Sequence, residues 1–143
     1  MRTRILITVL GALAVAGVPA LAHHSFAAEY DSSKPITLKG TVIKMDWVNP
    51  HSWLRIAVTG TDGKTVEWSC ETAPPNGLYR QGWRKTSVKE GDTVTVEGFQ
   101  AKDNSTTMNA RSVITADGKR MFAGTASDNG PGGDKSGDKS GDK

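Results

Sequence analysis

The chain has 143 residues, of which 23% are charged, 36% hydrophobic and 6% aromatic, with 16 glycines and 6 prolines. This composition indicates one soluble, turn-rich domain and excludes a wholly disordered chain or a membrane bundle. The formal net charge is +3, but Arg2 and Arg4 lie in a segment expected to be removed, which leaves 16 basic against 15 acidic residues. The charge balance therefore gives no reason to expect a nucleic-acid partner. A single cysteine excludes an internal disulfide framework and a four-cysteine zinc module.

Residues 1–22 have the pattern of a secretory signal peptide. Basic Arg2 and Arg4 precede an apolar run over 5–15, and the small residues Ala20-Leu21-Ala22 suit cleavage before His23. The apolar run is shorter than the ~20 residues that a membrane span needs, so we expect no membrane anchor after cleavage. The sequence therefore predicts a periplasmic or secreted protein whose mature chain begins at His23.

The other end of the chain is of low complexity. The segment Gly133-Asp134-Lys135-Ser136 repeats over 137–140, and apolar residues are almost absent from 125–143. Such a segment cannot bury enough apolar surface to compensate the entropy lost on ordering. We therefore predict a disordered tail over 125–143 and a folded domain over 23–124.

Within that domain the residues alternate between apolar and polar in the manner of β-strands. The pair Asp62-Gly63 is typical of a hairpin turn, and Pro74-Pro75 suits the start of a short helix. The predicted strands cover 36–47, 53–58, 66–71, 93–99 and 107–115, with the helix between the third and the fourth.

This order predicts an all-β domain with one short helix, folded as a five-stranded OB-like barrel. A small β-sandwich is the alternative that the same spacing allows. Cys70 falls in phase with the apolar residues of its strand and is expected to be a buried thiol. The residues predicted to point into the barrel are Val42, Leu54, Ile56, Val58, Val66, Trp68, Val94 and Val96.

Several motifs resemble those of an uncharacterised family of small exported bacterial proteins, classed as a domain of unknown function. They are His23-His24-Ser25-Phe26-Ala27-Ala28-Glu29-Tyr30, Trp47-Val48-Asn49-Pro50-His51 and Gly91-Asp92-Thr93-Val94-Thr95-Val96-Glu97-Gly98, and the similarity continues to Lys119. The resemblance implies export and a single β-domain, and it implies no activity. The chemistry must therefore come from the residues themselves.

The chain has three histidines, and two of them open the predicted mature protein. An N-terminal His23 offers an α-amine and an imidazole to one metal ion, and His51, in a turn between two strands, is a candidate third donor. His24 provides an alternative, because its backbone amide and imidazole also form a chelate with the terminal amine. Copper(II) leads the affinity order for such nitrogen ligands, ahead of zinc. Alternatively, the histidines are only polar residues of an exposed terminus and a turn.

The sequence favours a binding protein over an enzyme. It contains no nucleophile elbow, phosphate-binding loop or His-Glu-x-x-His helix. A different binding surface is also open: Trp53 and Arg55 are expected to project outward from the second strand with Trp47 nearby, as on OB-type ligand-binding faces. This face could bind a small ligand or another protein of the cell envelope, or the tryptophans could simply cover one end of the barrel.

Overall fold

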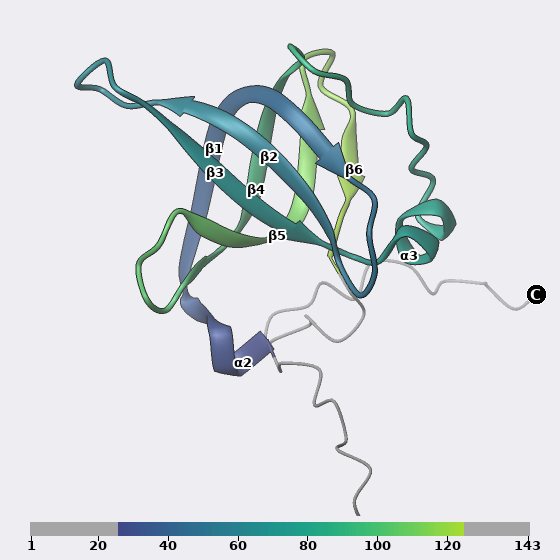
Figure 1. The fold of residues 1–143 in the computed structure, drawn as a ribbon, viewed down its shortest axis with the longest axis horizontal. Coiled ribbons are helices and arrows are strands. Elements are labelled where there is room, and N and C mark those ends of the chain that lie inside the picture. Colours follow the sequence, from purple (N-terminus) through teal and green to yellow (C-terminus); the bar gives the residue numbers. More distant parts are fainter. Residues whose placement is uncertain (1–25, 125–143) are drawn as a thin grey trace, which may run out of the picture.

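The computed structural model describes residues 26–124, which form two short helices and six strands (Figure 1). The predicted leader over 1–22, His23, His24 and the predicted tail lie outside these residues. No helix within 26–124 is long and apolar enough to cross a membrane. The elements are α2 (Phe26–Glu29), β1 (Tyr30–Asp46), β2 (Ser52–Thr59), β3 (Thr65–Thr72), α3 (Pro75–Arg80), β4 (Thr93–Ala101), β5 (Thr107–Thr115) and β6 (Arg120–Phe122).

The strands form one sheet in the order β3-β2-β1-β4-β5-β6, and an additional β3–β5 pairing closes the first five into a ring. That pairing is parallel, whereas the other pairs are antiparallel. Together with α3 between β3 and β4, this arrangement confirms the predicted all-β domain with a five-stranded barrel. Closing the ring leaves fewer exposed strand edges than an open sheet would have.

The long strand β1 makes the closure possible because it pairs with two different partners. Its earlier part pairs with β4 and its later part with β2. Gly40 lies where the strand passes from one partner to the other. A Cβ atom at Gly40 would lie 2.6 Å from the carbonyl oxygen of Ala57, so a side chain would push β1 and β2 apart.

The core lies inside the ring and follows the predicted alternation. Val42, Leu54, Ile56, Val94 and Val96 are all at most 2% exposed, and Val58 and Trp68 are partly buried against them. The prediction for Val66 is wrong, because its side chain is 43% exposed. Val66 has the inward phase but lies near the tip of the β2–β3 hairpin, which extends beyond the ring (Figure 1).

Three parts of the fold were not predicted. They are the helix α2, the first residues of β1 and the short strand β6. A strand of three residues is too short to show an alternating pattern, and β6 is instead fixed by contacts from distant residues. It pairs with β5, and the Trp83 Nε1 donates a hydrogen bond of 2.7 Å to the carbonyl oxygen of Phe122.

We expect the substitution Ile56→Asp to abolish cooperative folding, because Ile56 is 0% exposed and a carboxylate there would be buried without a charged partner. The matched control is Val66→Asp on the neighbouring strand, which should lower the free energy of unfolding by less than about 1 kcal/mol. Thermal unfolding followed by circular dichroism measures both. A cooperative Ile56→Asp transition at the wild-type temperature would contradict the assigned core.

Candidate functional site

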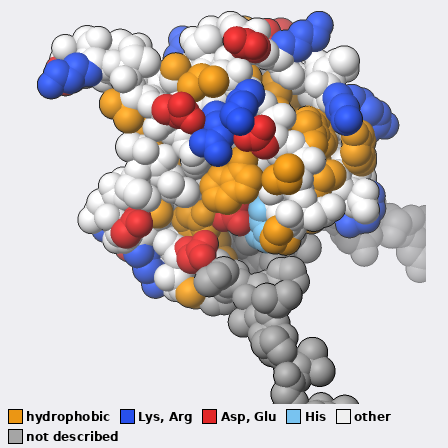
Figure 2. All heavy atoms as spheres, viewed as in Figure 1, with side chains coloured by type: hydrophobic (Ala, Val, Ile, Leu, Met, Phe, Trp, Pro, Cys, Tyr) orange, Lys and Arg blue, Asp and Glu red, His pale blue; other side chains and the backbone are white. Residues whose placement is uncertain are grey.

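His51 is the one predicted metal ligand that lies among the described residues. It stands in the turn immediately before β2, and its side chain is 27% exposed. Figure 2 shows the histidine at the surface beside a group of hydrophobic side chains. Its Nδ1 atom is buried and lies in close contact with Oε1 of Glu71. The ring is therefore held from its inner side by a carboxylate.

Glu71 occupies an unusual position for a carboxylate. It lies near the end of β3 and is paired with Trp53 of β2 and with Asn109 of β5. Directly paired residues share one face of a sheet. Cys70 is paired with the core residue Leu54 and points inward, so its neighbour Glu71, paired with Trp53, lies on the outer face. It is nevertheless only 8% exposed. A buried carboxylate needs polar partners, so the contacts that Glu71 makes are structurally important.

The second partner of Glu71 comes from the beginning of the described chain. The hydroxyl group of Tyr30, the first residue of β1, donates a hydrogen bond to Oε2 of Glu71. The ring of Phe26 in α2 packs against that of Tyr30, with centroids 5.7 Å apart, and against that of Phe99, at 5.5 Å. The N-terminal end of the described chain is thus attached to the same carboxylate that holds His51.

This arrangement suits metal binding by His51. Histidines that bind metals commonly present one ring nitrogen to the ion and the other to a carboxylate, which orients the ring. Among the described residues, Nε2 of His51 makes no hydrogen bond. The same part of the chain contains no group of three or more metal-ligating side chains. His51 therefore fits the role of one ligand, and a complete site needs donors from outside residues 26–124.

Sequence reasoning identified His51 but missed Glu71 and Tyr30. The alternation of β3 placed Glu71 on the outer face, where a carboxylate is normally exposed. Its burial depends partly on Tyr30 and Asn109, which are distant in the sequence and which alternation does not reveal. One sequence signal could have indicated the contact between His51 and Glu71: in an antiparallel hairpin, the turn before the second strand and the end of the third strand lie at the same end of the barrel.

The predicted ligand-binding face of Trp47, Trp53 and Arg55 makes more contacts within the protein than expected. Trp53 and Arg55 do lie on the outer face, each partly exposed. The Arg55 guanidinium, however, contacts Asp46 at 3.2 Å and Glu67 at 3.1 Å. These carboxylates raise the pKa of Arg55, with Asp46 the larger cause. Trp47 stacks on Tyr79 of α3, with ring centroids 5.2 Å apart.

Cys70 is a core residue, as predicted. It is 0% exposed, and burial raises the pKa of its thiol to about 12. Metals bind the thiolate form of cysteine. Because Cys70 is enclosed in the core, it does not reach the surface where His51 lies.

The Tyr30→Phe substitution tests the buried contact to Glu71. It should lower the free energy of unfolding by about 1–3 kcal/mol, because a buried carboxylate oxygen loses its hydroxyl donor. Tyr79→Phe is the matched control, since the Tyr79 side chain is 37% exposed and its hydroxyl makes no hydrogen bond within 26–124. Urea unfolding measures both changes. Equal stability of the two variants would contradict the role given to Tyr30.

A family model described as a family of unknown function, DUF6152, matches residues 12–110. The match confirms the resemblance to an uncharacterised family. The matched segment includes Tyr30, His51 and Glu71, and it ends within β5, before β6. No curated protein matches the chain.

Proposed function

The chain belongs to this family of unknown function, and we propose from the geometry around His51 that it is an exported copper-binding protein. After cleavage before His23, the α-amine and imidazole of His23 and the imidazole of His51 would bind one copper(II) ion. The alternative set replaces His51 with the backbone amide and imidazole of His24. In either case the site lies in the periplasm or outside the cell, and the protein is not proposed to be an enzyme.

The observation that carries this proposal is the contact between Glu71 and Nδ1 of His51. It favours a ring orientation in which Nε2 is available to a metal ion, and it restrains the ring before the metal arrives. Restraining a ligand in advance lowers the entropy lost on binding. The Tyr30 hydroxyl supports this arrangement, because it holds the other oxygen of the same carboxylate.

Chain length supports the participation of His23. Phe26 packs on Tyr30, and Tyr30 contacts Glu71, which contacts His51. Two residues separate Phe26 from His23, and the three chain steps between them span at most about 11 Å when extended. The mature terminus would thus be tethered, through Phe26 and Tyr30, to the same carboxylate that contacts His51.

The donor set favours copper(II) over zinc. Amine and imidazole nitrogens bind copper(II) more tightly than other divalent ions of the first transition series. Each donor must be deprotonated to bind, so acidifying the solution should weaken the complex. When bound, copper could supply electron-transfer or oxygen chemistry, whereas Glu71 and Tyr30 would only orient the histidine.

Calorimetric titration of the mature protein with copper(II), with zinc as the comparison metal, tests the proposal. We expect one copper(II) ion per chain and weaker binding of zinc. The His23→Ala variant keeps the amine and should bind more weakly without losing binding altogether. An added N-terminal glycine moves the amine out of position and should be at least as damaging.

Three further variants test the individual side chains. His51→Ala should weaken copper binding at least tenfold if His51 is a ligand, and should have no effect if His23 and His24 bind copper alone. Glu71→Gln removes the charge but keeps the size of the side chain, so it should weaken binding less than His51→Ala. Cys70→Ser controls for binding to the thiol. Equal copper affinity in the mature, glycine-extended and His23→Ala proteins would contradict the proposed site.

A further inference from the structure

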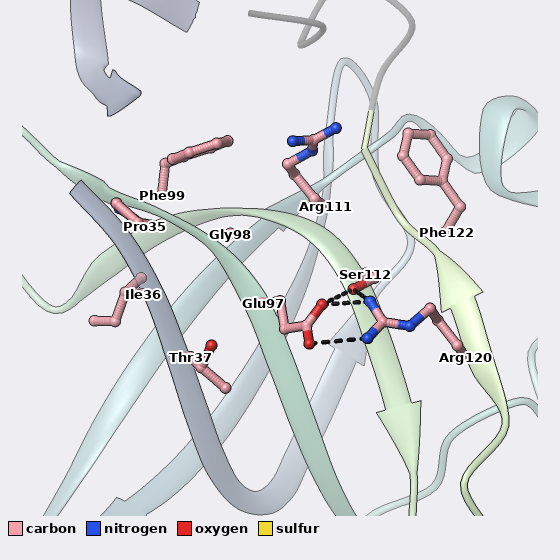
Figure 3. A pocket seen from close by; sticks show the side chains of 10 residues that line it. All are labelled: Pro35, Ile36, Thr37, Glu97, Gly98, Phe99, Arg111, Ser112, Arg120 and Phe122. Atoms are coloured by element: carbon pink, nitrogen blue, oxygen red, sulfur yellow. Dashed lines mark hydrogen bonds and ion pairs between the residues drawn. The ribbon is translucent and has the colours of Figure 1, made fainter. Parts of the chain in front are cut away.

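A second candidate binding site lies on the outer face of the sheet and includes neither His51 nor Glu71. It is a groove of about 720 Å³ formed by β1, β4, β5 and β6 (Figure 3). This volume is within the range of about 300–1,000 Å³ that small-molecule sites occupy. None of the predicted ligand residues lines it.

The floor of the groove depends on Gly98. The β4–β5 register shifts between Glu97 and Gly98, and there the backbone of β5 approaches unusually closely. A Cβ atom at Gly98 would lie 1.9 Å from the carbonyl oxygen of Asn109. The absence of a side chain at Gly98 therefore allows β4 and β5 to approach closely beneath the groove.

One end of the groove is electrically neutralised. Arg120 donates hydrogen bonds to both carboxylate oxygens of Glu97. Its Nη2 lies 3.0 Å from Oε1, and its Nη1 makes a closer contact with Oε2. The Ser112 hydroxyl donates a hydrogen bond of 2.7 Å to the same carboxylate. Arg120 and then Ser112 lower the pKa of Glu97. This end therefore offers little charge to a ligand.

The other end carries a cation with no carboxylate partner. Within residues 26–124, Arg111 forms no ion pair, and its guanidinium lies 5.7 Å from the ring centroid of Phe99. Figure 3 shows it between Phe99 and Phe122, and the Phe122 side chain is 43% exposed. Within the described residues, the groove thus places a positive charge that has no carboxylate partner beside the aromatic rings of Phe99 and Phe122.

We propose that this groove binds a small aromatic carboxylate. The planar, bidentate guanidinium of Arg111 would bind the carboxylate group, and the rings of Phe122 and Phe99 would contact the aromatic body. Pro35 and Ile36 of β1 contribute an apolar wall to the groove. One free arginine matches a singly charged carboxylate better than a multiply charged phosphate. The groove contains no proposed copper ligand, and its Phe99 ring also packs against Phe26.

The probe is 2-naphthoate, titrated into the purified protein in the presence of a metal chelator so that copper plays no part. Two-dimensional NMR should show saturable shifts centred on Gly98, Arg111 and Phe122. Arg111→Gln should weaken binding at least fivefold, and Phe122→Ala at least threefold. Lys64→Gln is the matched control, because it removes one positive charge from the hairpin tip, where Lys64 is 83% exposed.

Two related probes test which part of the ligand is recognised. The neutral 2-naphthamide should bind wild type no more tightly than it binds Arg111→Gln, and acetate should bind at least tenfold more weakly than 2-naphthoate. Unchanged spectra of each variant outside the groove establish that it is folded. Equal affinity of wild type and Arg111→Gln for 2-naphthoate, the absence of saturable shifts, or acetate binding as tightly as 2-naphthoate would overturn the proposal.

Discussion

The buried carboxylate of Glu71 connects three segments that are distant in the sequence. It lies on the outer face of β3, receives a hydrogen bond from Tyr30 at the start of β1, and contacts His51 before β2. Burial of a charged group is unfavourable unless it has such partners. The start of β1 at Tyr30 and the orientation of the only described histidine are therefore both linked to one side chain.

The barrel was predictable because its strands alternate and its one central helix stands between the third and fourth. Alternation identifies the face of a residue but not how far the ring extends, which explains why Val66 is exposed although it has the inward phase. The site was only partly predictable. His51 was chosen for its chemistry, whereas the burial of Glu71 depends on pairing with β5 and on Tyr30, which lies 41 positions earlier.

The arginines of the outer face illustrate why sequence alone could not rank the binding surfaces. The sequence predicted that Arg55, next to Trp53, would be available to a ligand, but Arg55 forms ion pairs with Asp46 and Glu67. Arg111 was not predicted to be a binding residue, yet it lies beside exposed aromatic surface without a carboxylate partner among residues 26–124. Which arginine is free depends on cross-strand neighbours, and these are defined by the register of the folded sheet.

The central claim is that His51, oriented by Glu71, binds copper together with the mature N-terminus. Pulsed electron paramagnetic resonance of the copper(II)-loaded mature protein tests it most directly, because the spectrum reports how many imidazole rings coordinate the ion. The account predicts two coordinated imidazoles in the wild-type protein and one in His51→Ala. The same number of coordinated imidazoles in both proteins would contradict it.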